Sequence, residues 1–418
     1  MKKYFYLLTA ALFLSGSTLF ANGLSLNSLG PRALGMGGAM VGLANDYTTI
    51  YWNPAGLRNL SGTYIGGYFT GIMPMGTYKY DAAGIDAETK SNIYPAPGLI
   101  GHWQCMLSDK GTVGLGVYVP AGLGAEWDGA DFTAFAGGQN LNWSSQVGVI
   151  NISPAFAYQL SDQLALGFAV NIFYGMFDME NGSSGAQYEE SSSGFGYGVT
   201  LGAHFKVNEM ISLGASFRTK TDVKMSGEAK NPGMALVPAA MGGPYPTKSD
   251  FDRDVSWPMW IGGGVAVKPV EGLTLALDVQ YSQWSESEKE FQTEFDNAGW
   301  AAVTGATGDD KFILKWEDAT QIRFGAEYMV NEMITVRGGF YTDPAPAPDE
   351  TYNFLFPSID YNGITGGASI NISGVVVDLG AEYLIGSERD IAPTTENVPG
   401  KHNMNIFAFS IGTGFAIK

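Results

Sequence analysis

Along most of the chain, apolar residues alternate with small or polar ones. The clearest case is residues 405–418, NIFAFSIGTGFAIK, where Phe407 and Phe409 share one face and Ser410 lies on the other. Residues 375–383 alternate in the same way. Successive side chains of a β-strand point to opposite faces, so this period of two predicts strands that are apolar on one face.

Fourteen such segments follow one another, and the connections between them are alternately short and long. We expect strands near residues 62–73, 94–106, 112–125, 146–160, 163–175, 194–207, 210–224, 255–268, 273–284, 316–330, 334–342, 361–372, 375–385 and 402–417. An even number of strands with short turns at one end and long loops at the other is typical of bacterial outer-membrane barrels. A secreted sandwich would also alternate, but in lipid only a closed barrel satisfies every strand edge. The pattern therefore predicts an all-β fold, a 14-stranded antiparallel transmembrane β-barrel.

The N-terminal part of the chain lacks this alternation. Residues 1–21 carry two lysines, then an apolar run and small residues, which is typical of a secretion signal. Residues 22–60 are mostly small and apolar, and we expect them to fill the barrel lumen as an N-terminal plug, or hatch. The expected regions are thus a signal peptide (1–21), the hatch (22–60) and the barrel (61–418).

Composition fits a barrel with something inside it. Glycine accounts for 57 of 418 residues, roughly twice the usual ~7%, and small inward-facing residues leave room in a lumen. The net charge of −18 argues against a nucleic-acid partner, which requires basic surfaces. The single cysteine, Cys105, excludes an internal disulfide.

One short motif lies where the hatch should meet the wall. In YWNPAGL, residues 51–57, Pro54 fixes its own φ and restrains Asn53 to an extended conformation. We expect Asn53, Pro54 and Ala55 to end the hatch and turn the chain into the wall. The Asn53 amide could bond a wall backbone and act as a latch. The alternative is a rigid corner needed only for folding.

Four segments resemble the FadL/TodX (OMPP1) family of outer-membrane transporters. They are ALGMGGAMVGLANDYTTIYWNPAGL (33–57), GLGVYVPAGLGAEW (114–127), ISPAFAYQLSDQLALGFAV (152–170) and DATQIRFGAEYMVNEMITVRGGFYTDPAPAPDE (318–350). The resemblance implies a 14-stranded barrel with an N-terminal hatch and an inward kink in the third strand that opens a sideways passage. It also implies passive uptake of hydrophobic molecules across the outer membrane, with long-chain fatty acids as the expected cargo.

The third expected strand contains a candidate for that kink. Pro120, Ala121 and Gly122 interrupt it, because proline removes a ladder donor and glycine within a strand marks a bulge or bend. The alternative is that these residues are simply the outer end of the strand.

Candidate ligand contacts are basic residues expected to face the lumen. Arg218 and Lys220 are the expected contacts for a fatty-acid carboxylate. For Arg323 and Arg337 we favour internal ion pairs with Asp278, Glu327, Asp378 and Glu382.

We expect no enzyme activity, cofactor or metal site. The three histidines are scattered and there is no Gly-x-Ser-x-Gly motif. The expected partners are hydrophobic small molecules, outer-membrane lipid and lipopolysaccharide, with the protein a monomer. Two other functions remain open: a structural or adhesive barrel with a fixed plug, and a TodX-like channel for aromatic hydrocarbons.

Overall fold

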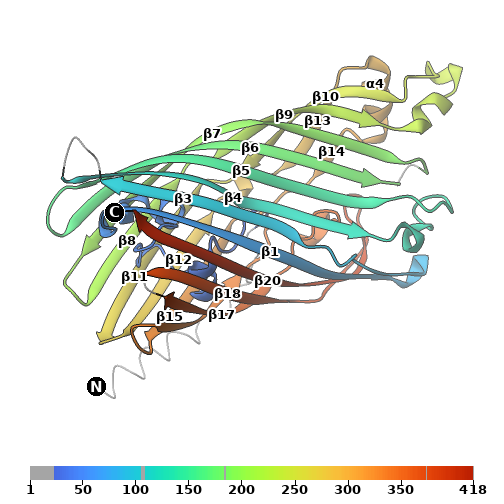
Figure 1. Ribbon diagram of the computed structural model, residues 1–418. Coiled ribbons are helices and arrows are strands. Elements are labelled where there is room, and N and C mark those ends of the chain that lie inside the picture. The colour runs from blue at the N-terminus through green and yellow to red at the C-terminus, as the bar shows by residue number, and fades with distance from the viewer. Residues whose placement is uncertain (1–22, 105–108, 183–184, 373, 418) are drawn as a thin grey trace.

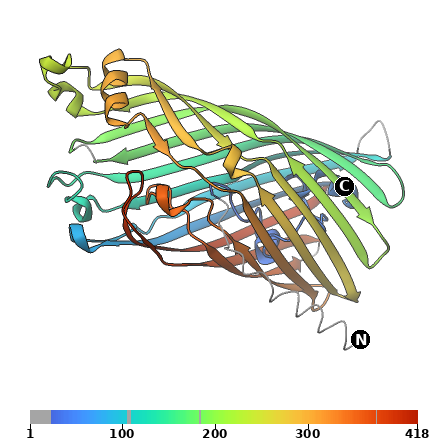
Figure 2. The ribbon, with the colours of Figure 1, turned by 180° about the vertical axis from the view of Figure 1, so that it is seen from behind.

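The chain folds into a long barrel in a computed structural model that describes residues 23–104, 109–182, 185–372 and 374–417 (Figures 1 and 2). The described residues form a closed antiparallel barrel of 14 strands, which confirms the predicted fold class. The barrel closes where β1 (Thr63–Tyr80) pairs with β20 (Gly400–Ile417), from Thr63↔Ile417 to Lys79↔Lys401. The expected signal peptide, 1–21, and Cys105 lie outside the described residues.

Two of the 14 wall strands are each broken into two pieces. Between β1 and β20 the wall consists of β3 (Tyr94–Gln104), β4 (Gly111–Trp127), β5 (Trp143–Gln159), β6 (Leu164–Asn181), β7 (Tyr188–Lys206), β8 (Ile211–Arg218) with β9 (Thr221–Lys230), β10 (Lys248–Trp257) with β11 (Trp260–Val270), β12 (Leu273–Ser282), β15 (Ala319–Met329), β16 (Ile334–Asp343), β17 (Tyr361–Ile372) and β18 (Val375–Gly386). Short strands in the long loops are β2 (Ile85–Glu88), β13 (Glu290–Phe295), β14 (Lys311–Ile313) and β19 (Arg389–Ile391).

The breaks in the seventh and eighth wall strands lie side by side and were not predicted. Trp260 pairs with Arg218 below them, and Trp257 pairs with Thr221 above them. Across each break the inward-facing positions change from even to odd numbers, since Ser216 and Gly262 are buried below it while Val223 and Val255 are buried above it. A prediction that continues the two-residue alternation through such a break therefore places the side chains of one half of the strand on the wrong face of the wall.

Several strands extend beyond their predicted ends. β6 and β7 pair as far as Asn181↔Tyr188, although residues 176–193 were expected to be a loop. The outer parts of these strands carry charged and serine residues such as Glu180 and Ser191. In this part of β6, Phe177 and Met179 are buried toward the lumen while Asp178 and Glu180 face outward. The outward apolar face that reveals a strand in lipid therefore ends before the strand does.

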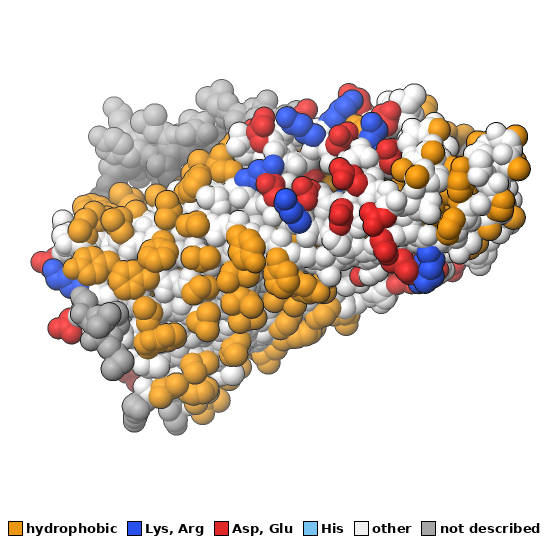
Figure 3. Space-filling model, turned by 90° about the horizontal axis from the view of Figure 1, so that it is seen from above, with side chains coloured by type: hydrophobic (Ala, Val, Ile, Leu, Met, Phe, Trp, Pro, Cys, Tyr) orange, Lys and Arg blue, Asp and Glu red, His pale blue; other side chains and the backbone are white. Residues whose placement is uncertain are grey.

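Outside, the barrel divides into an apolar region and a charged one. Figure 3 shows hydrophobic side chains spread over the end with the short turns, and acidic and basic side chains gathered nearer the other end. Exposed apolar residues include Leu99, Phe168, Leu201 and Ile411. An outward apolar band is what a lipid-facing barrel wall requires.

The lumen at the short-turn end holds the hatch. Residues 24–60 fold there as α2 (Pro31–Gly35), α3 (Thr49–Trp52) and the 3-10 helix η1 (Pro54–Asn59), and most of their side chains are buried. The C-terminal end of β20 lies at the same end of the barrel (Figure 1). Helices in the described part of the chain, including α4 (Ala298–Thr307), are too short or too polar to cross a membrane.

A second core fills the upper lumen. Wall strands and several loops contribute to it, and at its centre the loop between β16 and β17, residues 344–360, folds inward and buries Tyr352, Phe354, Leu355 and Phe356. The lumen therefore has a hatch at one end and an aromatic loop toward the other.

Candidate functional site

The hatch lies against small residues of the wall. A Cβ at Gly214 would lie 1.9 Å from the Val41 carbonyl oxygen, and one at Gly325 would lie 2.4 Å from the Met36 carbonyl oxygen. At Gly167 it would lie 2.3 Å from the Ala55 nitrogen. The abundant glycine thus serves close approach of two backbones, because a larger side chain at these wall positions would displace the hatch.

Wall side chains also hold the hatch by its backbone. The Asp278 carboxylate accepts hydrogen bonds from Val41 N at 2.7 Å and Gly42 N at 3.3 Å. Arg323 Nη1 donates to the carbonyl oxygens of Asn27 at 2.8 Å and Gly37 at 3.0 Å. The expected ion-pair partners of Arg323 are thus replaced by hatch carbonyls.

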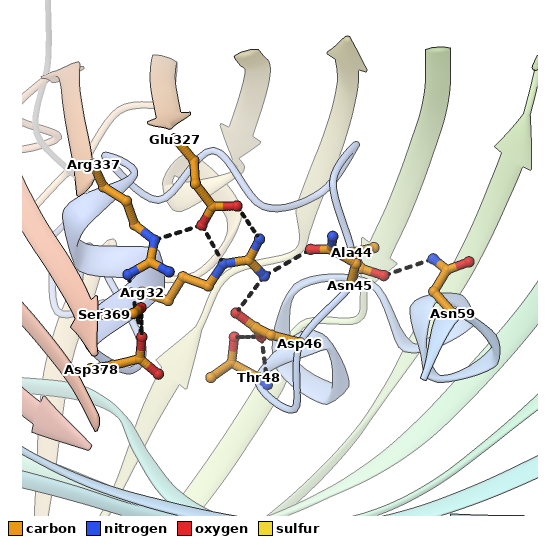
Figure 4. Close-up of polar contacts among 10 residues, drawn as sticks. All are labelled: Arg32, Ala44, Asn45, Asp46, Thr48, Asn59, Glu327, Arg337, Ser369 and Asp378. Carbon is orange, nitrogen blue, oxygen red and sulfur yellow. Dashed lines mark hydrogen bonds and ion pairs between the residues drawn. The ribbon is translucent and has the colours of Figure 1, made fainter. Parts of the chain in front are cut away.

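A chain of charges joins α2 to strands β15, β16 and β18 (Figure 4). Arg32 of the hatch forms two hydrogen bonds with Glu327, at 2.8 and 2.9 Å, and contacts Asp46 at 3.4 Å. Arg337 binds Glu327 at 2.6 Å and Asp378 at 3.2 Å. These are internal ion pairs of the kind expected for Arg337 from the sequence. Burial alone would lower the pKa of Arg32, but Glu327 and Asp46 outweigh this effect and raise it.

Sequence reasoning did not identify Arg32. The sequence did contain a signal, because Arg32 is the one charged residue between residues 22 and 44. A lone charge in a segment expected to be buried needs a partner, because burying an unpaired charge is costly.

The Asn53-Pro54-Ala55 motif lies where the hatch meets the wall. Asn53 is fully buried, and its Nδ2 donates to Val41 O of the hatch at 3.1 Å and to Ala203 O of wall strand β7 at 3.0 Å. Its Oδ1 accepts from Ala55 N at 3.2 Å, which caps η1. The amide therefore links two parts of the hatch and the wall; whether it opens as a latch stays a prediction.

The third wall strand, β4, loses its neighbour at the Pro120 motif. Its pairing with β3 ends at Gly98↔Tyr118, and its register with β5 shifts between Tyr118 and Ala121. Beyond this point, Pro120 O accepts from Leu26 N at 3.0 Å, and Gly122 N donates to Leu24 O at 2.9 Å. The start of the hatch therefore takes the place of a wall strand along this edge.

The opposite edge of this gap cannot easily close. β3 carries Pro95 and Pro97 there, and proline has no N–H to donate to another strand. The Tyr94 ring reaches across at one point, since a Cβ at Gly124 of β4 would lie 2.3 Å from it.

A cavity of about 380 Å³ reaches from the lumen to this gap. Its apolar lining comes from the hatch (Leu26, Leu34), from the gap edges (Pro95, Pro97, Val119, Gly122) and from the wall beyond (Ile72, Val147, Ile150, Met176, Leu384, Ile406). This volume lies within the usual range for small-molecule sites.

The two predicted carboxylate contacts lie elsewhere. Arg218 Nη2 donates to the Tyr51 carbonyl oxygen at 2.9 Å, and its guanidinium lies 4.2 Å from the centre of the Tyr51 ring. Lys220 comes after β8 has ended, and it faces outward like Asp222, with which it forms an ion pair at 3.1 Å. The prediction that Lys220 faces the lumen is wrong, because even-numbered residues face inward before the break and outward after it. A ligand contact by either residue stays a prediction.

The inward-folded loop 344–360 is fastened at its polar ends. Arg389 Nη1 donates to the carbonyl oxygens of Ala347 at 2.9 Å and Ser358 at 2.8 Å. Asp360 Oδ1 accepts from Ala345 N at 2.9 Å. Burial raises the pKa of Asp360 to about 6. The sequence contained a signal for this fold, the apolar run YNFLF in a segment we expected to be an outer loop.

Groups suited to metal binding do not gather in this structure. Among the described residues, no three His, Cys, Asp or Glu side chains are placed to hold a metal ion. His102, His204 and His402 lie on three different strands, β3, β7 and β20.

Comparison with known proteins identifies relatives over nearly the whole chain. Residues 11–415 match the family model described as outer membrane protein transport protein (OMPP1/FadL/TodX). Outer membrane protein P1 of Haemophilus influenzae is 21% identical over 357 residues, which cover 74% of this chain and 73% of that protein.

Solved structures share the fold. A Pseudomonas aeruginosa FadL homologue matches with a TM-score of 0.78 and 14% identity, covering 95% of this chain and 100% of that one. The Ralstonia pickettii toluene transporter TbuX matches with a TM-score of 0.71 and 17% identity, covering 94% and 99%. At such identities the likeness shows the fold alone, whereas the family match spans the chain from the first strand to the last. The chain belongs to the OMPP1/FadL/TodX family of outer-membrane transport proteins.

Proposed function

We propose that this protein takes up hydrophobic molecules passively and releases them sideways through the wall between β3 and β4. The observation that carries the proposal is the apolar cavity at the position where β4 no longer pairs with β3. A lipid-facing wall of 14 strands has no structural need for such a gap, which leaves backbone groups of β4 to be satisfied by the hatch.

The contacts of the hatch suggest which part moves. Its body is held by Asp278, Arg323, Arg32 and the wall glycines. Its first residues, Leu24 to Leu26, are held to β4 by two backbone hydrogen bonds. Withdrawal of this short segment would open the gap while the rest of the hatch stays in place.

Both fatty acids and aromatic hydrocarbons have the apolar body that this cavity suits. Long-chain fatty acids are the cargo expected from the sequence, and TbuX is a toluene transporter. A structural or adhesive barrel with a fixed plug remains the alternative from another class, but it gives no role to a cavity that reaches a wall gap. No energy source is needed for a hydrophobic molecule that leaves water for lipid.

Substitution of Gly122 by leucine tests the route. A Cβ there would meet only Val147 O, at 3.4 Å, so the side chain can be added and would occupy the cavity. We expect Gly122→Leu to reduce uptake of radiolabelled toluene several-fold, in a host that lacks its own transporters. The folded, heat-resistant band on gels should be unchanged.

Gly263→Leu is the matched control, because an added Cβ at this exposed wall glycine meets nothing within 4 Å. Unchanged uptake by Gly122→Leu would contradict sideways release and favour exit at the periplasmic end. Uptake by the wild type no greater than by an empty vector, with the barrel folded, would overturn transport itself.

A further inference from the structure

The cavity at the wall gap is apolar along most of its length but has a polar pole. Its two acidic lining residues, Asp343 and Glu382, are on β16 and β18, and the hydroxyl residues Ser28 of the hatch and Tyr361 of β17 also line it. We call these four residues the polar pole. Further hydroxyl groups in the lining belong to Ser25, Thr70, Tyr94 and Ser358. The gap residues of β3 and β4 belong to the apolar remainder.

The members of the polar pole are linked through neighbouring strands. Asp343 and Tyr361 are direct partners in the pairing of β16 with β17. Asn27 Nδ2 donates to Asp343 at 2.6 Å, and Ser28 follows Asn27 in the chain. Tyr341, two residues before Asp343, donates to Glu382 at 3.0 Å.

Three of these groups have unused hydrogen-bonding capacity. The Ser28 and Tyr361 hydroxyl oxygens are buried without a hydrogen-bond partner among the described residues. Glu382 is 8% exposed, and within the described chain Tyr341 is the residue that donates to it, through one carboxylate oxygen. Buried polar groups are nearly always satisfied in native structures, so unpaired hydroxyls lining a cavity indicate a ligand with a polar group.

The charge of the lining excludes one kind of polar group. Of the described residues that line the cavity, Asp343 and Glu382 are acidic and none is basic. Arg323 does not line the cavity: it is stacked 4.6 Å from the Tyr341 ring centre, binds hatch carbonyls, and donates to Oδ1 of the lining residue Asn27 at 3.1 Å. Arg218 lines an adjoining pocket of about 20 Å³, which shares Ser25, Leu26 and Ala121 with the cavity, and its guanidinium is bound to Tyr51. A carboxylate at the polar pole would face two acids, and both nearby arginines are already engaged by other partners.

We infer that the cavity selects an uncharged hydrophobic molecule with a hydroxyl head, such as a phenol or a long-chain alcohol, and discriminates against carboxylates. A hydroxyl group can donate to Glu382 and accept from Ser28 or Tyr361. One such group would therefore serve both the free acceptor of Glu382 and an unpaired hydroxyl donor. The inference rests on the proposed transport function and names the cargo of that same cavity.

Three probes of nearly equal size separate the possibilities: 1-naphthol, naphthalene and 1-naphthoate. At about pH 7 the naphthol is neutral and the naphthoate is ionised. Binding to the purified protein in detergent is measured by equilibrium dialysis, and uptake is measured in cells. We expect naphthol to bind more tightly than naphthalene, and at least about tenfold more tightly than naphthoate, because of the like charges.

Two variants assign the preference to the polar pole. Tyr361→Phe removes a hydroxyl that has no partner, so the fold should be unaffected, while the preference for naphthol over naphthalene should fall about fivefold. Glu382→Gln removes an ionisable carboxyl group but keeps an acceptor for Tyr341, and should raise naphthoate binding several-fold. The matched controls are Tyr383→Phe, on the exposed face of β18, and Glu388→Gln, in an exposed loop; neither should change these ratios.

Each result distinguishes this inference from the proposed function. Equal binding of naphthol and naphthalene, or tighter binding of naphthoate, would overturn the inference while leaving transport intact. An unchanged preference in Tyr361→Phe and Glu382→Gln would also overturn it. Naphthol selectivity in dialysis without uptake above the empty vector would overturn transport and leave the selectivity of the cavity established.

Discussion

Asn53 makes three contacts with one amide group. Its two N–H groups bind the hatch at Val41 and the wall at Ala203, and its oxygen caps η1 through Ala55. An amide is the smallest side chain that both donates twice and accepts. Aspartate would lose both donors and serine would lose one, so the position requires asparagine for its chemistry as well as its size.

Truncation of this amide should loosen the hatch at the wall. We expect Asn53→Ala to destabilise the attachment by about 2 kcal/mol, at about 1 kcal/mol for each lost hydrogen bond from Nδ2. Barrel assembly should persist, because the strands carry most of the stability, and uptake should change. Heat-modifiability on gels and uptake are measured on the same variant, with Asn331→Ala in a short turn as the control. Loss of the folded band would show that the motif is a rigid corner needed for folding.

Single residues show where sequence reasoning succeeds and where it stops. Arg337 could be assigned to an ion-pair lattice because acids are close along the predicted wall. The outward position of Lys220 could not be predicted, because it depends on a strand break that leaves no gap in the apolar pattern. The carbonyl partners of Arg323 were also hidden, since a sequence does not show which backbone groups of a buried segment lack partners.

At the scale of elements, period-two alternation predicted the wall strands because lipid on one side and a small-residue lumen on the other impose it. The prediction fails where that environment ends. β6 and β7 continue above the apolar band with polar residues on the outward face, and the short strands β13 and β14 pair within a loop. The inward fold of residues 344–360 was missed because length alone marked the segment as an outer loop.

The protonation state of Asp360 should affect the stability of that inward-folded loop. Burial raises the Asp360 pKa to about 6, above the usual value of about 3.9, so the fold favours the protonated form. Its contribution to stability is present below about pH 4 and is lost as the pH rises through about 6. We expect amide protection factors in residues 345–359 to decrease over this range, measured by hydrogen exchange.

Asp360→Asn should remove most of this pH dependence, because asparagine keeps an acceptor for Ala345 N without a charge. Asp390→Asn, in the neighbouring strand β19, is the control and should behave like the wild type. Equal pH dependence in Asp360→Asn and in the wild type would assign the effect to other groups of the loop.

At the scale of the whole molecule, barrel and hatch are one packing unit. Wall glycines meet hatch backbone at several points around the barrel, and the charge chain of Arg32, Glu327, Arg337 and Asp378 fastens α2 to one side. On the opposite edge of the hatch, Leu24 to Leu26 contact β4 through backbone hydrogen bonds. The hatch thus has a body held by ion pairs and close packing, and a first segment held by backbone hydrogen bonds and by the burial of Leu24, so the two attachments can be tested separately.

Removal of the Arg32 charge should release the fixed body without touching the gap. Glu327 would keep Arg337, but Asp46 and one side of Glu327 would lose their cation in a buried setting, where breaking an ion pair costs about 3–5 kcal/mol. We expect Arg32→Met to raise ion conductance across planar bilayers several-fold, because a loosened hatch admits water and ions. Lys248→Met breaks an exposed pair with Glu228, at 2.9 Å, which is worth at most about 1 kcal/mol, and should leave conductance at the wild-type level. Wild-type conductance in Arg32→Met would mean that close packing against the wall glycines holds the hatch body without the charges.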